Sequence, residues 1–182
     1  MDELANKVEA TVPMFTGEQR IIYERVHSAL MEGEQLLAFI DARGGCGKTF
    51  LTNAILGMVR TLEPGGCVAL ATATTGIAAN LLHLGRTVHS SLKAPLILSM
   101  ESALQVSGQS SLANLVRMAK LILIDEATML DRLLLEDLGR SLKDLMGEQK
   151  TPFGGKTLLL AGDFRHCLPV VKEAELKLSS TA

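Results

Sequence analysis

Residues 42–49, ARGGCGKT, form a glycine-rich segment between an apolar run and the helical pattern FLTNAILGMV. Strand, glycine-rich loop and helix in this order predict a phosphate-binding P-loop. Glycines let backbone amides curl around phosphate oxygens, and the start of the helix adds partial positive charge. We expect Lys48 to reach the β- and γ-phosphates of a nucleotide and the Thr49 hydroxyl to bind Mg²⁺. The residues of this segment expected to contact the nucleotide are Gly44, Gly45, Cys46, Gly47, Lys48, Thr49 and Phe50.

The pattern GxxxxGK[ST] has glycine where this chain has Ala42. An ordinary glycine-rich turn is therefore the alternative interpretation of the segment. The apolar run before it and the helical pattern after it favour the phosphate cradle, because a P-loop requires both.

A pair of carboxylates, Asp125 and Glu126, directly follows the apolar run at residues 121–124. In a P-loop enzyme such a strand ends close to the cradle. We expect Asp125 to hold Mg²⁺, directly or through water, and Glu126 to orient and deprotonate the attacking water. Lys48, Asp125 and Glu126 are thus the predicted catalytic residues. The alternative is that the two carboxylates simply begin the next helix, where negative charge is favourable.

Strand and helix patterns alternate along the chain. The continuous apolar runs, typical of strands buried on both faces, are Leu36–Ala42, Val68–Ala73, Leu121–Ile124 and Thr157–Ala161. The helical patterns are Thr16–Met31, Gly47–Leu62, Gly76–Leu82 and Thr128–Met146. This alternation predicts an α/β fold, a mostly parallel sheet flanked by helices. Residues 99–111 are small and polar, and we expect them to form a surface loop without chemistry.

The composition argues against several classes of protein. With 18 basic and 20 acidic residues, the chain lacks the charge excess of a protein that holds nucleic acid by itself. The three cysteines contain no CxxC pair, which argues against a zinc site or a disulfide framework. The first residues are polar and acidic, and no apolar run approaches the length of a membrane span. We therefore expect a soluble intracellular protein with no membrane association.

Five ordered segments resemble those of the Pif-type (petite integration frequency) DNA helicases, especially the forms related to Helitron transposons. The segments are FTGEQRIIYERV, DARGGCGKTF, ATATTGIAANLL with GRTVHSSLKAPL, LILIDEATML and PFGGKTLLLAGDFRHCLPVV. The resemblance implies a RecA-like ATP-binding domain at residues 15–171. A polar segment at 1–14 is expected to precede it and a tail at 172–182 to follow it, with the second RecA-like domain of the family absent from these residues.

The resemblance also implies roles for single residues. Gln19 matches the glutamine that recognises adenine, whereas the residues alone predict only a solvated glutamine at a helix start. His166 stands where the family has a glutamine that senses the γ-phosphate, and imidazole has a different length and titrates near neutral pH. The residues that match contacts to single-stranded DNA are Thr74, Thr75, Gly76, His89 and Ser90. Small residues of this kind also serve as turns and helix caps.

The sequence therefore predicts the amino-terminal motor domain of a DNA helicase that binds and hydrolyses Mg·ATP and contacts single-stranded and duplex DNA weakly by itself. The resemblance implies five-prime to three-prime unwinding, roles in DNA repair, recombination and telomere maintenance, and action in the nucleus, with the mitochondrion as second choice. Two alternatives stay open. One is a non-catalytic nucleotide-binding remnant of a transposon-derived helicase, which Ala42 and His166 favour. The other is a different P-loop enzyme, such as a small-molecule kinase, against which the segments GDFRH and TATTGIAA argue.

Overall fold

A computed structural model of the chain describes residues 2–63, 67–93 and 108–166. Its centre is a five-stranded sheet in the order β1-β5-β4-β2-β3, and every neighbouring pair is parallel. The strands are β1 Leu37–Asp41, β2 Val68–Ala73, β3 Arg86–Thr87, β4 Ala119–Asp125 and β5 Thr157–Gly162. Because all strands run the same way, their carboxyl ends meet at one edge of the sheet.

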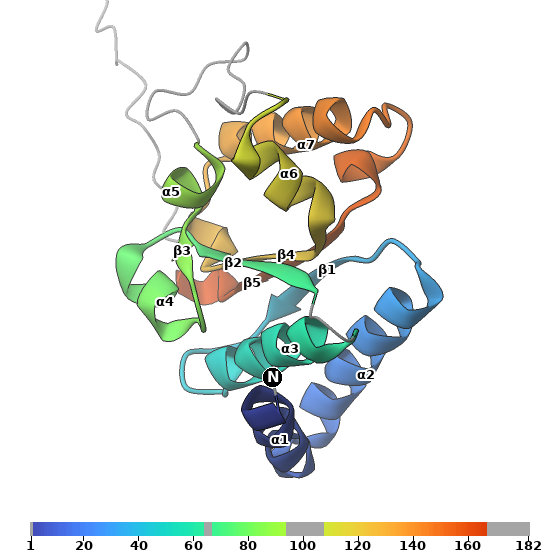
Figure 1. Cartoon of the computed structure of the whole chain (residues 1–182). Helices are drawn as coiled ribbons and strands as arrows, with labels where there is room; N and C mark the ends of the chain where they lie inside the picture. Colours follow the sequence, from blue (N-terminus) through green and yellow to red (C-terminus); the bar gives the residue numbers. More distant parts are fainter. Residues whose placement is uncertain (1, 64–66, 94–107, 167–182) are drawn as a thin grey trace, which may run out of the picture.

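Helices cover both faces of this sheet, as Figure 1 shows, with α1, α2 and α3 on one side and α6 and α7 on the other. The α-helices are α1 Asp2–Thr11, α2 Gly17–Glu32, α3 Lys48–Thr61, α4 Gly76–Leu81, α5 Val88–Leu92, α6 Ser111–Met118 and α7 Arg132–Met146. Short 3₁₀ helices are η1 Val12–Met14, η2 Ala127–Met129, η3 Pro152–Gly155 and η4 Phe164–His166. The predicted α/β fold with a parallel sheet flanked by helices is confirmed.

Strand β4 explains why the apolar runs are continuous. Its Leu121 and Leu123 belong to the core beneath α3, whereas Ile122 and Ile124 belong to the core beneath α7. Successive side chains of a strand point to opposite faces, so a strand between two helical layers needs apolar residues at every position. All four side chains are fully buried, which stabilises the fold by roughly 1.5–3 kcal/mol for each.

Helix α7 begins later than expected, at Arg132 rather than Thr128. The chain first leaves β4 through Glu126, whose backbone is left-handed, and forms η2. Asp131 then caps the helix, because its carboxylate accepts a hydrogen bond from the amide of Leu133 at 2.7 Å. The side-chain cap fixes the first residue of the helix, which the apolar pattern alone does not define.

Several elements have no counterpart in the expected set, namely α1, α5, α6, β3 and the short 3₁₀ helices. Helix α1 lies within the segment expected to be polar and packs Val8 against α3 at Gly57, where an added Cβ would come within 2.6 Å of Val8. The domain boundary at residue 15 stays a prediction. The expected loop at 99–111 falls largely outside the described residues, as does the tail at 172–182, while Ser111 begins α6. Within the part of the chain that the structure describes, no helix is both long and apolar enough to cross a membrane.

Candidate nucleotide-binding site

The glycine-rich loop joins the end of β1 to the start of α3. Gly45 and Gly47 both have left-handed backbones, with φ of +79° and +77°, which an L side chain rarely adopts. A Cβ on Gly47 would also lie 2.7 Å from Nε2 of Gln19. The left-handed backbone therefore favours glycine at both positions, and a side chain at position 47 would in addition require the end of the Gln19 side chain to move.

Lys48, the first residue of α3, folds back over this loop. Its ammonium donates a hydrogen bond to the carbonyl oxygen of Ala42 at 3.0 Å. The amide of Ala42 in turn donates to the carbonyl of Gly162 at 3.1 Å. Ala42 is not among the described residues with positive φ, so its methyl group costs no backbone strain. Alanine thus fits this position, because the loop uses only its backbone.

Asp125 ends β4 on the same edge of the sheet and is 3 % exposed. Burial raises the pKa of its carboxyl, and the neighbouring Glu126 carboxylate adds to the rise. The amide of Glu126, which donates to Asp125 Oδ1 at 2.9 Å, and the ammonium of Lys48 both lower the same pKa. The ammonium of Lys48 therefore acts electrostatically on the Asp125 carboxyl, and their joint role in one nucleotide site stays a prediction.

The oxygen donors of this site suit Mg²⁺. Thr49 brings a hydroxyl and Asp125 a carboxylate, and hard divalent cations prefer such ligands. No group of three or more His, Cys, Asp or Glu side chains able to hold a metal occurs among the described residues. Mg²⁺ commonly keeps waters and binds through one or two carboxylates plus substrate phosphates, which matches the small donor set.

Glu126 has a left-handed backbone, with φ +51° and ψ +38°. This conformation costs a non-glycine residue about 1–2 kcal/mol, so surrounding contacts must hold it. The Thr74 hydroxyl donates to the Glu126 carbonyl at 2.9 Å, and the Met129 amide donates to the same carbonyl at 3.0 Å. Gly162 leaves room for this turn, because a Cβ there would meet Thr128 at 2.9 Å.

Gln19 connects α2 to the glycine-rich loop. Its side chain completes a capping box with Thr16, accepting from the Thr16 amide at 3.0 Å. Its Nε2 also donates to the carbonyl of Cys46 at 3.3 Å. Gln19 therefore lies at the start of α2, as the residues alone predicted, and it also contacts the glycine-rich loop. Recognition of adenine by Gln19 stays a prediction.

Phe50 follows Thr49 and is 38 % exposed. Its ring meets the buried ring of Phe15 edge to face, with centroids 5.7 Å apart, and Phe15 in turn meets Tyr23 at 5.3 Å. These three aromatic side chains join α2 to the start of α3. The contact of Phe50 to nucleotide stays a prediction.

Asp163, in the segment GDFRH, has no role assigned from the sequence. The residue is 1 % exposed, and its carboxylate accepts a hydrogen bond from the amide of Gly44 at 3.2 Å. Arg165 donates to the other carboxylate oxygen through its backbone amide at 3.0 Å and its guanidinium at 3.3 Å. Asp163 thus attaches the segment after β5 to the glycine-rich loop. His166 ends η4 close by in sequence, and its contact to the γ-phosphate stays a prediction.

The segments expected to contact DNA follow two neighbouring strands, because Ala73 of β2 pairs with Thr87 of β3. Thr75 caps α4 by accepting from the Ala78 amide at 3.2 Å. Thr87 caps α5 by accepting from the Ser90 amide at 3.2 Å. Capping, the alternative interpretation of these small residues, is therefore one of their functions. Among the expected contacts Gly76 and Ser90 are exposed and His89 is half-buried, so DNA binding by this set stays a prediction.

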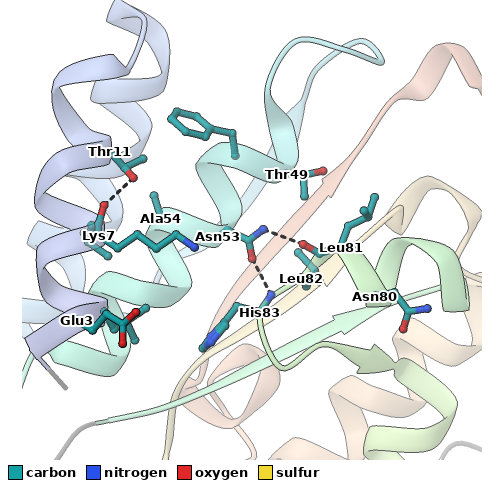
Figure 2. A pocket seen from close by; sticks show the side chains of 13 residues that line it. Glu3, Lys7, Thr11, Thr49, Asn53, Ala54, Asn80, Leu81, Leu82 and His83 are labelled. Carbon is teal, nitrogen blue, oxygen red and sulfur yellow. Dashed lines mark hydrogen bonds between the residues drawn. The ribbon is translucent and has the colours of Figure 1, made fainter.

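A cavity of about 820 Å³ lies beside the glycine-rich loop, between α1, α3 and the chain that follows α4. Figure 2 shows its wall, where the side chain of Asn53 points toward the backbone of Leu81 and His83. The cavity includes Thr49 and Phe50 but neither Lys48 nor the acidic pair. It is therefore a neighbour of the phosphate cradle and not the cradle itself.

Comparison with known proteins identifies the family. The family model of the PIF1-like helicases matches residues 14–181. The ATP-dependent DNA helicase PIF1 of Mus musculus is 31% identical over 175 residues, covering 93% of this chain and 24% of that protein. RRM3 of Saccharomyces cerevisiae, also an ATP-dependent DNA helicase, is 28% identical over 177 residues, covering 96% of this chain and 23% of that protein.

A solved structure agrees with the sequence comparison. The Pif1 helicase from Bacteroides in complex with ADP-AlF3 and single-stranded DNA superposes with a TM-score of 0.67 at 26% identity, over 87% of this chain and 34% of that one. The chain spans about a quarter of the length of these two relatives and about a third of the solved helicase. The predicted RecA-like P-loop fold and the resemblance to Pif-type helicases are confirmed. The chain belongs to the PIF1-like helicase family.

Proposed function

We propose that this chain is the Mg·ATP-binding and hydrolysing part of a DNA helicase motor. The observation that carries the proposal is topological: Lys48 and Thr49 follow the end of β1, Asp125 ends β4 and Glu126 follows it, and these two parallel strands lie on either side of β5. The Bacteroides relative, described in complex with ADP-AlF3 and single-stranded DNA, supports both ligands.

In the proposed reaction, Lys48 exchanges the carbonyl of Ala42 for oxygens of the β- and γ-phosphates. Glu126 accepts a proton from the water that attacks the γ-phosphorus in line, the bond to the ADP oxygen breaks, and inorganic phosphate leaves. Thr49 and Asp125 would hold Mg²⁺, which compensates the charge on the phosphates.

The rigid surroundings of Glu126 support its assignment as the base. Its backbone is fixed by Thr74, by Met129 and by the carboxylate of Asp125, so its side chain leaves β4 in a defined direction. A catalytic group held in place in this way loses little freedom when substrate binds.

A non-catalytic nucleotide-binding remnant is the second candidate, favoured by His166 in place of the family's glutamine. Ala42 no longer supports it, because the loop uses only the backbone at this position. ATP turnover with and without single-stranded DNA separates the two candidates. Binding of ATP without phosphate release, in this chain and in the full-length protein, would establish the remnant.

For the substrate we propose single-stranded and duplex DNA, contacted by residues that follow β2 and β3, namely Thr74, Thr75, Gly76, His89 and Ser90. Translocation from five prime to three prime, and roles in repair, recombination and telomere maintenance, are proposed from the family alone. A nuclear location is proposed, with the mitochondrion as the alternative. A fluorescent fusion of the full-length protein, imaged with markers of both compartments, tests the location.

A further inference from the structure

We propose that helix α4 is attached at both ends to the nucleotide site and reports its occupancy, with Thr74 and Asn53 as the two positioning residues. The inference deepens the proposed function and rests on it, because it requires nucleotide to bind at the glycine-rich loop. Each attachment joins segments that are far apart in the sequence.

The first attachment lies before the start of α4. The Thr74 hydroxyl donates to the carbonyl of Glu126 at 2.9 Å, and the Thr74 amide donates to the carbonyl of Asp125 at 3.1 Å. The next residue, Thr75, caps α4. A shift of the acidic pair is therefore passed to the first turn of the helix through two hydrogen bonds and one residue.

The second attachment lies at the end of α4 and is visible in Figure 2. Asn53 lies on α3, one helical turn after Thr49. Its Nδ2 donates to the carbonyl of Leu81 at 2.8 Å, and its Oδ1 accepts from the amide of His83 at 2.8 Å. One amide side chain thus holds two backbone groups of the chain that leaves α4.

Arg60 strengthens this second attachment from further along α3. Its guanidinium donates to the carbonyl of His83 at 3.0 Å and lies 2.7 Å from His83 Nδ1. The same guanidinium donates to the carbonyl of Ala69 in β2 at 3.1 Å. Residues 81–83 are therefore connected to the P-loop helix by two of its side chains.

The turn after α4 is too tightly packed to absorb a displacement. A Cβ on Gly85 would lie 2.2 Å from the carbonyl oxygen of Ala79, and Leu84 has a left-handed backbone with φ +56°. A turn of this kind has few alternative conformations. Movement of α3 is therefore expected to carry α4 with it, instead of being taken up by the connection.

The outer side of α4 faces solvent, with Ile77 81% and Leu81 59% exposed. Helix α4 follows β2 and helix α5 follows β3, and these two strands are paired. A change at the nucleotide site thus reaches the surface that we propose for DNA. By thermodynamic reciprocity, DNA bound at α4 would alter nucleotide affinity by the same factor.

Hydrogen–deuterium exchange on the 182-residue chain tests the inference without requiring hydrolysis or DNA binding. We expect saturating Mg·ATPγS to slow exchange at least threefold in peptides covering residues 74–84. Asn53→Ala is expected to lose most of this change while nucleotide affinity, measured with a fluorescent ATP analogue, stays within about threefold. Asn53→Asp keeps the acceptor for His83 and loses the donor to Leu81, so we expect an intermediate change.

Thr74 provides a second comparison. Thr74→Val removes the hydroxyl at nearly constant volume and is expected to lose the nucleotide-dependent change, whereas Thr74→Ser retains the hydroxyl and the change. Asn6→Ala, at an exposed position of α1, is the matched control and should behave as the unaltered chain. Far-ultraviolet circular dichroism establishes that each variant is folded.

The outcomes separate the inference from the proposed function. If nucleotide binds the unaltered chain but exchange at 74–84 does not change, or if Asn53→Ala and Thr74→Val keep the full change, the inference is wrong and the proposed function stands. If no nucleotide binds, the proposed function fails and the inference with it.

Discussion

The ammonium of Lys48 lies 3.0 Å from the carbonyl oxygen of Ala42, so a hydrogen bond joins the two ends of the glycine-rich loop. A phosphate group entering the loop offers charged oxygens in place of this neutral carbonyl. Attraction between opposite charges adds to the hydrogen bond when the ammonium's acceptor is a phosphate oxygen, so the exchange favours the bound state.

Lys48→Ala is therefore expected to weaken ATP binding roughly ten- to hundredfold, since a hydrogen bond to a charged group contributes about 1.5–3 kcal/mol. Titration with a fluorescent ATP analogue measures the loss. Lys150→Ala, at an exposed lysine in the turn after α7, is the control and should bind as the unaltered chain. Equal affinity of the Lys48 variant and the control would exclude the P-loop assignment.

Glu126→Gln is expected to retain ATP binding and to reduce turnover at least a hundredfold, because amide and carboxylate have similar volume but the amide is no base. Its carbonyl contact to Thr74 is made by the backbone and should survive the substitution. Phosphate release under single-turnover conditions, with ATP affinity measured in parallel, checks the expectation. Turnover at the rate of the unaltered chain would mean that another group takes the proton.

Asp125→Asn is expected to raise the melting temperature of the ligand-free chain at neutral pH. The pKa of Asp125 is raised above 3.8, chiefly by burial, so the folded state holds this proton more tightly than the unfolded state. The stabilisation from protonated Asp125 is fully present below pH 3.8, the ordinary pKa of an aspartate. It decreases as the pH rises through the raised pKa of the folded state and is lost at higher pH. Asparagine carries no charge at any pH and avoids this loss.

The advantage of Asp125→Asn should therefore shrink as the pH is lowered from neutral through the raised pKa of Asp125, as followed by thermal melts in low-salt buffer. Mg·ATP should reverse the order, because a ligand stabilises the form that binds it more tightly. A ligand-free variant that melts below the unaltered chain at pH 7.5 contradicts the expectation.

Cys46 is expected to react with iodoacetamide faster than Cys67, and Mg·ATP is expected to protect it. Cys46 is exposed in the loop before α3, whereas burial and the neighbouring Glu63 raise the pKa of the Cys67 thiol and keep it from forming the reactive thiolate. Mass spectrometry of the labelled peptides gives both rates. Identical labelling of Cys46 with and without nucleotide would show that nucleotide does not cover this loop.

Patterns in neighbouring residues predicted most of the fold and both parts of the candidate site. The loop around Lys48 and the acidic end of β4 are each formed by consecutive residues. The order of residue types in each segment therefore indicates both the local structure and the chemistry. The ends of helices were less predictable than their presence. Helix α7 starts later than the apolar pattern indicates, because the left-handed backbone at Glu126 turns the chain before Asp131 caps the helix.

Contacts between distant segments could not be predicted in this way. Asp163 reaches Gly44 across 119 residues, and Thr74 reaches Glu126 across 52. The residues next to Asp163 and Thr74 in the sequence do not indicate these partners. Each partner is a backbone amide or carbonyl group, and almost every residue has both. Helix α1 was not predicted for a related reason: its sequence is mostly polar, and its buried Val8 packs against α3, where Gly57 leaves room for it.

The 182-residue chain by itself is expected not to unwind DNA, however well it binds ATP. Phosphoryl transfer in motors of this kind is completed by an arginine delivered across a cleft, which contributes on the order of a thousandfold or more in rate. Arg165 is a poor substitute, because its guanidinium is bonded to Asp163 of the same domain. These residues also match only 34% of the solved Bacteroides helicase. We expect slow hydrolysis, little stimulation by single-stranded DNA, and no strand separation in a forked-duplex assay at saturating ATP. Robust unwinding by the purified chain would contradict this expectation and would point to a second copy supplying the arginine, which sedimentation at the assay concentration can detect.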